Sequence, residues 1–215
     1  MIYIKKGMEP IDWSFQRRTP GSDFDGTDKS SLRQSLLEEQ GYLCAYCMKR
    51  IRYNKDIKIE HYHARNAENQ FDYKNLLAVC TGNVTTSNMK THMDPKRFTC
   101  DSMKKDQTLH IDPQNQTDMN TIYYDNQGKI YSNRYQEDLD NLLNLNDPQG
   151  YLISNRKAAL QAVIRKLTTL HPDQNALPLL IKLRKYCYEK NANGEYPEYV
   201  GIMRWFVDRQ IRKHQ

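Results

Sequence analysis

The chain has 215 residues, of which 38% are hydrophobic and 27% charged, enough for one domain with an appendage or for two small domains. Its formal net charge of +6 is compatible with a polyanionic partner, and its 15 tyrosines can stack on bases or pack at the edge of a core. No apolar run approaches the length of a membrane span, and no apolar stretch follows Lys5 and Lys6, which excludes a secretory signal. We therefore expect a cytoplasmic protein that does not enter a membrane.

The first half of the chain begins as a polar segment and continues as short apolar elements. Residues 1–29 are rich in turn formers, and we expect an ordered arm at most. A helix is predicted from about residue 30 to the stop at Gly41, because leucines recur there at helical spacing. Two short strands are predicted over 51–53 and 57–60 with a turn between them, and an apolar run follows over 75–80.

The second half predicts a hairpin and then helices. An Asp-Asn-Gln-Gly turn at 125–128 separates two tyrosine-containing strands. Helices are expected over 135–145, 150–170, 176–191 and 197–213. The last helix carries large apolar and basic residues, so it either docks a partner protein or closes a helical bundle. The predicted regions are an arm (1–29), a Cys/His-rich domain (30–115) and a hairpin with a helical, partner-docking bundle (116–215).

Four of the five cysteines fall between positions 44 and 100. Cys44 and Cys47 form a Cys-x2-Cys knuckle whose thiolates can bind one zinc ion. A structural zinc takes four ligands, and Cys80 and Cys100 are the available further thiols. With no export signal evident, we expect metal ligands or buried thiols and not disulfides. Because two further cysteines lie nearby, we favour zinc over a merely buried pair or a redox pair. Cys187 stands alone in an apolar helix pattern and is assigned to the core.

A carboxylate next to a histidine ends the second predicted strand. Glu60-His61 supplies what one-metal cleavage of a phosphodiester needs: an oxygen ligand for Mg²⁺ or Mn²⁺ and a base that titrates near neutral pH. The metal polarises the scissile phosphate, and the histidine takes a proton from the attacking water. Glu-His by itself is more often a polar surface pair, so its meaning depends on its surroundings.

The surroundings carry a longer pattern. The chain contains, in order, Cys44-x2-Cys47, Glu60-His61, Asn75-Leu-Leu-x-x-Cys80 and Cys100-Asp-x-x-Lys104. This order resembles the HNH endonuclease family, and within that family the PtuB-type proteins of Septu anti-phage systems and retron-linked defence cassettes. The resemblance covers roughly residues 30–110.

The resemblance implies a role for each residue of the pattern. It makes His61 the general base and makes Glu60 and Asp101 the ligands of a catalytic Mg²⁺ or Mn²⁺. Asn75 would orient the His61 ring through a backbone or imidazole hydrogen bond. Lys104 would contact phosphate. From its own position, on the same strand face as His61, His63 either contacts phosphate, serves as a reserve base or is simply exposed. The structural zinc would be held by Cys44, Cys47, Cys80 and Cys100.

The third position of the pattern has two candidates. Residues 81–99 interrupt the second pair of cysteines, and Asn83 lies close to the usual step from Asn75. We favour Asp101 over Asn83 because two carboxylates suit a hard cation. His92, in the same interruption, is either a solvated loop residue or a substrate contact.

The implied fold is α+β: a zinc-stapled ββα-metal nuclease core followed by an α-helical C-terminal region. The resemblance also implies DNA or RNA as substrate and an ABC-type ATPase of the PtuA kind as partner. The chain has no Gly-x-x-x-x-Gly-Lys-Ser/Thr loop of its own, so any nucleotide switch belongs to another chain. Two competing interpretations are a non-catalytic, zinc-dependent nucleic-acid-binding module and an adaptor whose zinc knuckle only supports protein contacts.

Overall fold

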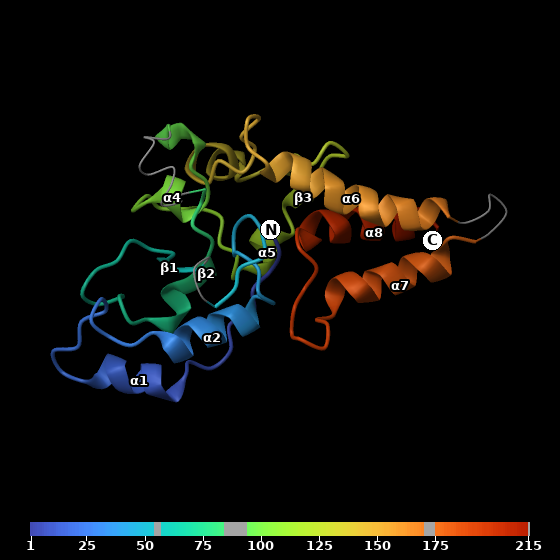
Figure 1. The fold of residues 1–215 in the computed structure, drawn as a ribbon. Helices are drawn as coiled ribbons and strands as arrows, with labels where there is room; N and C mark the ends of the chain where they lie inside the picture. Colours follow the sequence, from blue (N-terminus) through green and yellow to red (C-terminus); the bar gives the residue numbers. More distant parts are fainter. Residues whose placement is uncertain (54–56, 84–93, 170–174, 215) are drawn as a thin grey trace.

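The computed structural model describes residues 1–53, 57–83, 94–169 and 175–214 (Figure 1). Its helices are α1 (Ile11–Arg18), α2 (Ser30–Glu39), α4 (Asp101–Lys104), α5 (Gln116–Met119), α6 (Leu152–Thr168), α7 (Leu177–Tyr188) and α8 (Val200–Lys213), with short helical turns η1 (Tyr73–Asn75), η2 (Pro95–Arg97) and η3 (Asp138–Leu142). Two antiparallel two-stranded sheets are formed by β1 (Lys58–His61) with β2 (Leu76–Val79) and by β3 (Ile122–Tyr124) with β4 (Ile130–Ser132). This mixture of helices and small sheets confirms the coarse part of the predicted fold.

The sheet that carries Glu60 and His61 differs from the expected strand pair. β1 pairs with β2, so that His61 lies opposite Leu76. All of β2 is buried, as expected for a continuous apolar run in the interior, whereas residues 51–53 belong to no strand. The sequence prediction of a strand at 51–53 is therefore wrong, and the turn predicted at 54–56 lies outside the described residues.

Helix α2 covers β2 and fixes its position. Leu32, Leu36 and Leu37 are fully buried on one face of the helix, which confirms the predicted leucine pattern. Just after the helix, Gln40 donates its Nε2 to the Ala78 carbonyl (2.7 Å) and accepts the Ala78 N–H on Oε1 (2.8 Å). These two hydrogen bonds join the helix end to the strand that holds β1.

The N-terminal segment contains more structure than an arm. Helix α1 lies within it, and the Trp13 side chain of that helix is 1% exposed. The Trp13 indole donates to the Phe71 carbonyl (3.1 Å) and contacts the rings of Phe71 and Phe24. Through Trp13 and Phe24, the N-terminal segment is therefore packed against the half of the chain that carries β1 and β2 (Figure 1).

The second half agrees largely with the sequence. The predicted hairpin is β3–β4, and α6, α7 and α8 correspond to the last three predicted helices. The helix expected over 135–145 is reduced to the π-helical turn η3. There the Asp138 carboxylate accepts the backbone N–H groups of His110 (2.6 Å) and Ile111 (2.7 Å), so the turn is anchored to a neighbouring segment and does not continue along a helix axis.

Helix α8 closes the helical bundle. It packs against α6 and α7 and buries Val200, Ile202, Met203 and Val207. Of the two roles predicted for this helix, closing the bundle is the one that the packing supports. None of the helices in the described ranges is long and apolar enough to cross a membrane.

Packing crosses both predicted region boundaries. Met1 and Ile4 belong to the same buried cluster as residues of α6–α8, and Ile4 donates its N–H to the Pro113 carbonyl (2.8 Å). Tyr199, directly before α8, donates its N–H to the Met48 carbonyl beside the cysteine knuckle (3.0 Å). The Cys/His-rich half and the helical half therefore share one core.

Candidate metal centre and active site

Four buried thiols converge on one point. The Sγ atoms of Cys44, Cys47, Cys80 and Cys100 lie within 4.8 Å of one another. Tetrahedral zinc–thiolate coordination, with bonds of about 2.3 Å, separates the sulfur atoms by roughly 3.8 Å. The separations are 3.9 Å for Cys44–Cys100, 3.7 Å for Cys47–Cys80 and 3.8 Å for Cys80–Cys100. The predicted ligand set therefore fits one structural zinc ion.

The first two thiols are presented by a closed backbone turn. Cys44 donates its N–H to the Lys49 carbonyl (2.9 Å), and Met48 donates its N–H to the Cys44 carbonyl (3.1 Å). Met48 has a φ of 62°, and this left-handed conformation reverses the chain directly after Cys47. The Lys49 N–H then reaches Cys47 Sγ at 3.5 Å and closes the turn around this thiol.

The other two thiols come from segments that are far apart in sequence and joined by their backbones. The Thr99 N–H, directly before Cys100, donates to the carbonyl of Gly82, two residues after Cys80 (3.1 Å). Gly82 has a φ of +60°, and a Cβ there would lie 2.1 Å from the Thr99 carbonyl oxygen. Only glycine permits this approach. The residues between these segments, including His92, lie outside the described ranges.

Glu60 lies in the interior beside the cysteine knuckle. Its side chain is 4% exposed, and its Oε1 accepts the Tyr46 hydroxyl (3.1 Å) and lies 2.6 Å from the Lys104 ammonium. Burial, followed by the neighbouring Asp101 carboxylate, raises the pKa of Glu60 to about 8, and Lys104 opposes this rise. Glu60 and Asp101 therefore interact as a pair of carboxylates.

A second lysine holds the other carboxylate. Asp101 is the first residue of α4, and its Oδ2 lies 3.2 Å from the Lys58 ammonium, which also donates to Ser102 (2.9 Å). Lys58 and Glu60 are two residues apart on β1, so they point to the same face. Each carboxylate of the pair thus has its own ammonium partner.

Lys104 occupies a different place from the one predicted. It is 0% exposed, and besides Glu60 its ammonium reaches the carbonyls of His61 and Lys105, both at 3.2 Å. A phosphate contact requires an ammonium at the surface. The predicted substrate contact of Lys104 is therefore corrected to a buried ion pair with Glu60, because α4 turns this side chain inward, onto β1.

His61, the last residue of β1, is half-buried and its ring is fixed on two sides. Its Nε2 lies 3.0 Å from the Gln70 carbonyl oxygen, and the Phe24 ring packs edge-on at a centroid distance of 4.6 Å. Because a carbonyl oxygen only accepts, Nε2 carries the proton and Nδ1 keeps the lone pair. Burial lowers the pKa of His61, so the neutral imidazole dominates at neutral pH.

Asn75 clamps the chain directly after His61. Its Oδ1 accepts the His63 N–H (2.7 Å), and its Nδ2 donates to the His63 carbonyl (3.0 Å). The hydrogen bond expected of this residue therefore reaches the backbone two residues beyond His61, and not the His61 imidazole. The His63 ring itself is exposed and packs edge-on against Tyr62.

Asn83 and Asp101, the two candidates for the third position of the HNH-like pattern, have different surroundings. The Asn83 side chain donates to the Arg97 carbonyl (3.1 Å) and accepts the Tyr151 hydroxyl. Asp101, in contrast, interacts with Glu60 and Lys58. Of the two, Asp101 lies beside the predicted metal ligand.

Sequence reasoning missed three side chains of this region. Tyr46 and Lys58 bind the two carboxylates, and Phe24 packs on His61. The spacing of Lys58 and Glu60 along one strand could have indicated the first lysine. Nothing in the sequence places Phe24 beside a histidine that lies 37 positions further along the chain.

In the described part of the chain, the four cysteines form the one group of three or more His, Cys, Asp or Glu side chains that can share an ion. Glu60, His61 and Asp101 do not form such a group, so the three-residue convergence on one ion is not observed. No protein-family model and no curated protein matches the chain.

Proposed function

We propose that the chain is a metal-dependent HNH endonuclease that hydrolyses phosphodiester bonds of nucleic acid on a zinc-stapled ββα-metal core. One observation carries the proposal: the buried Glu60 carboxylate interacts with the Asp101 carboxylate, and Glu60 is followed on β1 by a histidine whose Nε2 faces a backbone carbonyl. The order β1, β2, α4 and the cysteine cluster beside it support the same assignment.

His61 has the properties of a general base. The Gln70 carbonyl holds Nε2 as the protonated nitrogen, which leaves the basic Nδ1 to accept a proton from water. The lowered pKa keeps this nitrogen unprotonated near neutral pH. Asn75 holds the backbone at His63, which limits how far the end of β1 and the His61 ring can shift. We assign Asn75 as a positioning residue.

Glu60 and Asp101 are the residues that would hold Mg²⁺ or Mn²⁺. Such ions are often bound through one or two carboxylates and complete their coordination with water and substrate phosphate, so a pair of oxygens fits. When bound, the ion supplies polarisation of the scissile phosphate and stabilisation of the leaving oxygen. Without the ion, the ammonium groups of Lys58 and Lys104 balance the negative charges of the same carboxylates.

The two ammonium partners also favour a second candidate function. A carboxylate pair that is already neutralised by Lys58 and Lys104 needs no divalent ion, as in a zinc-dependent nucleic-acid-binding or adaptor protein without catalysis. This second function predicts binding without cleavage. Cleavage that depends on added Mg²⁺ or Mn²⁺ is therefore the property that separates the two.

The test compares wild type with His61→Ala on plasmid DNA and on tRNA, with added Mg²⁺ or Mn²⁺. His214→Ala removes an exposed histidine after α8 and serves as the matched control. Loss of a general base slows cleavage by about 10²- to 10⁴-fold, so wild type and His214→Ala should cut and His61→Ala should not. Equal cleavage by His61→Ala would remove His61 from the mechanism, and cleavage by no variant supports the binding protein.

We further propose that the nuclease is an effector of an anti-phage system and works with an ABC-type ATPase of the PtuA kind. This partner rests on the sequence pattern alone. The assay above should therefore be run with and without such an ATPase, and co-purification measured alongside. Free cleavage by the chain alone, with no association, would disprove the partnership and leave the nuclease proposal intact.

A further inference from the structure

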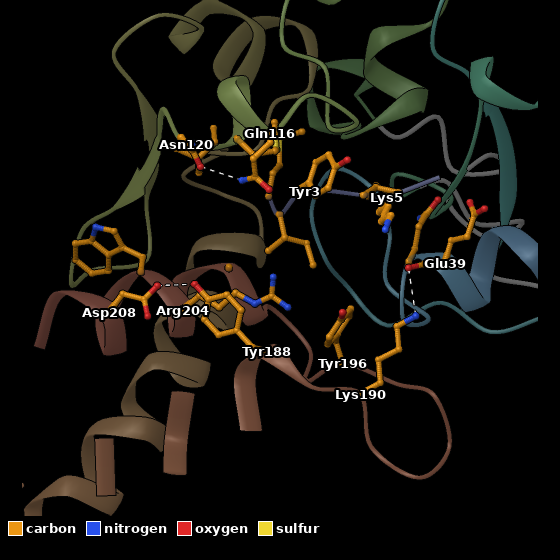
Figure 2. Close-up of a pocket in the computed structure, with 18 of the residues that line it drawn as sticks. Tyr3, Lys5, Glu39, Gln116, Asn120, Tyr188, Lys190, Tyr196, Arg204 and Asp208 are labelled. Atoms are coloured by element: carbon orange, nitrogen blue, oxygen red, sulfur yellow. Dashed lines mark hydrogen bonds between the residues drawn. The ribbon is translucent and has the colours of Figure 1, made fainter. Parts of the chain in front are cut away.

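A second surface feature lies outside the candidate active site. A cavity of about 1130 Å³ opens between the N-terminal segment and α8 (Figure 2). Figure 2 shows Tyr3 and Lys5 on one side of it and Arg204, Tyr188 and Tyr196 on the other. Its walls are rich in aromatic and basic side chains, a combination that no step of the proposed cleavage uses.

The first wall is a pinned, extended segment. Ile4 is buried and bonded through its N–H to Pro113 (2.8 Å), and the Lys6 ammonium lies 2.9 Å from Glu39. Tyr3 and Lys5, the residues on either side of the buried Ile4, are exposed. Tyr3 is 38% exposed, so its ring is open to a ligand without any movement of the backbone.

Three aromatic side chains of the cavity, Tyr123, Tyr188 and Tyr196, are held by contacts of their rings. The Tyr123 ring stacks on Tyr131 at a centroid distance of 5.4 Å and an interplanar angle of 18°, and it remains 39% exposed. Across the cavity, the Arg204 guanidinium lies over the rings of Tyr188 (4.4 Å) and Tyr196 (4.9 Å). Fixed, partly open π-faces stack on unpaired bases at little entropic cost.

The charges of the cavity are complementary to a polyanion. Two of its three acidic side chains are ion-paired within the protein, Glu39 with Lys6 and Asp208 with Arg184 (2.9 Å), and the third, Glu38, accepts a hydrogen bond from Gln34 (2.6 Å). Lys5 and Arg212, in contrast, are exposed and have no acidic partner among the described residues. Phosphate groups would neutralise these cations, and the counterions released would make binding salt-dependent.

The N-terminal segment also borders the residues that follow His61. A second cavity of about 520 Å³ is lined by His63 and Asn75. Tyr3, Lys5 and the residues next to them line both cavities, so one short segment connects them. Tyr3 and Lys5 therefore border both the large cavity and the surroundings of His63 and Asn75.

We propose that this groove binds a single-stranded segment of the nucleic-acid substrate, whose bases stack on Tyr3 and Tyr123 and whose phosphates lie near Lys5 and Arg212. The inference rests on the proposed nuclease function and adds its substrate class. Stacking on tyrosine requires unpaired bases, so the groove selects single strands over duplex.

The test measures binding of a fluorescent oligothymidylate to the full chain by anisotropy, without added Mg²⁺ or Mn²⁺. Tyr3→Ala should weaken binding by roughly fivefold to a hundredfold, and Lys5→Ala should reduce the salt dependence of log K by about 0.7. The matched controls are Tyr186→Ala and Lys182→Ala, which remove exposed side chains of α7 outside this cavity. They should bind as wild type does.

Three outcomes would overturn the groove proposal. These are no binding of the oligothymidylate, equal affinity for a hairpin duplex, or equal losses in the groove and control variants. Each can occur while wild type still cleaves and His61→Ala does not, so failure of the groove is distinct from failure of the nuclease. Conversely, the chain could bind oligothymidylate through Tyr3 and never cleave nucleic acid. That result would support the groove as a binding site and reject the nuclease proposal.

Discussion

Replacing Asn75 tests whether the end of β1 must be clamped for His61 to act. The Asn75 side chain is 4% exposed and makes two hydrogen bonds to the His63 backbone, of 2.7 and 3.0 Å. Each such bond contributes about 0.5–1.5 kcal/mol, so Asn75→Ala should lower the free energy of unfolding by about 1–3 kcal/mol. The cleavage rate of the folded variant should also fall, because the strand end that carries His61 is released.

Two further variants separate the clamp from general destabilisation. Asn75→Asp retains an acceptor for the His63 N–H but sets a carboxylate oxygen against the His63 carbonyl, so it should also lose activity. Asn115→Ala removes the side-chain cap of α5, which accepts two backbone N–H groups, and should cost a similar 0.5–2 kcal/mol while leaving cleavage intact. Urea unfolding and cleavage rates per folded molecule are the measurements. Full activity of Asn75→Ala at unchanged stability would refute the clamp.

Three other perturbations follow from the same contacts. Trp13→Ala should lower the free energy of unfolding by about 3–5 kcal/mol in urea titrations, because the side chain is fully buried between aromatic rings; a loss below 1 kcal/mol would show that α1 is not anchored. Gly82→Ala should reduce zinc content measured by atomic emission, since its Cβ would meet the Thr99 carbonyl, whereas Gly21→Ala, with a φ of +79° but open space around it, should retain zinc. The acid limb of the pH–rate profile should have its midpoint below about pH 6.5, because the pKa of His61 is lowered and this base stays deprotonated until the pH falls through that pKa. A midpoint above this pH would contradict the assignment of His61 as the base.

The cysteine cluster and the helices were accessible to sequence reasoning because each follows from a local or strongly constrained rule. A Cys-x2-Cys knuckle that binds a structural zinc requires two further ligands, and Cys80 and Cys100 were the available thiols. The hairpin β3–β4 follows from its turn residues, and α6–α8 follow from the spacing of their apolar residues.

Strand pairing and side-chain direction were not accessible in the same way. The pattern around 51–53 resembles a strand as well as Leu76–Val79 does, and only the burial of the latter under α2 decides between them. The charge of Lys104 suggests solvent or phosphate, but α4 points this side chain at Glu60. Trp13 and Phe24 are isolated aromatics in a polar segment, and their contacts with Phe71 are long-range.

The metal centre and the carboxylate pair are coupled through single peptide bonds. Tyr46, which donates to Glu60, directly precedes the zinc ligand Cys47, and Asp101 directly follows the zinc ligand Cys100. A four-residue helix such as α4 is not stable alone, so its position depends on what holds its first turn. A zinc ion on Cys100 would fix that turn, and with it the carboxylate of Asp101. Bound at the four thiols, zinc would therefore do more than stabilise the fold: it would set the distance between the two carboxylates on which the proposed chemistry depends.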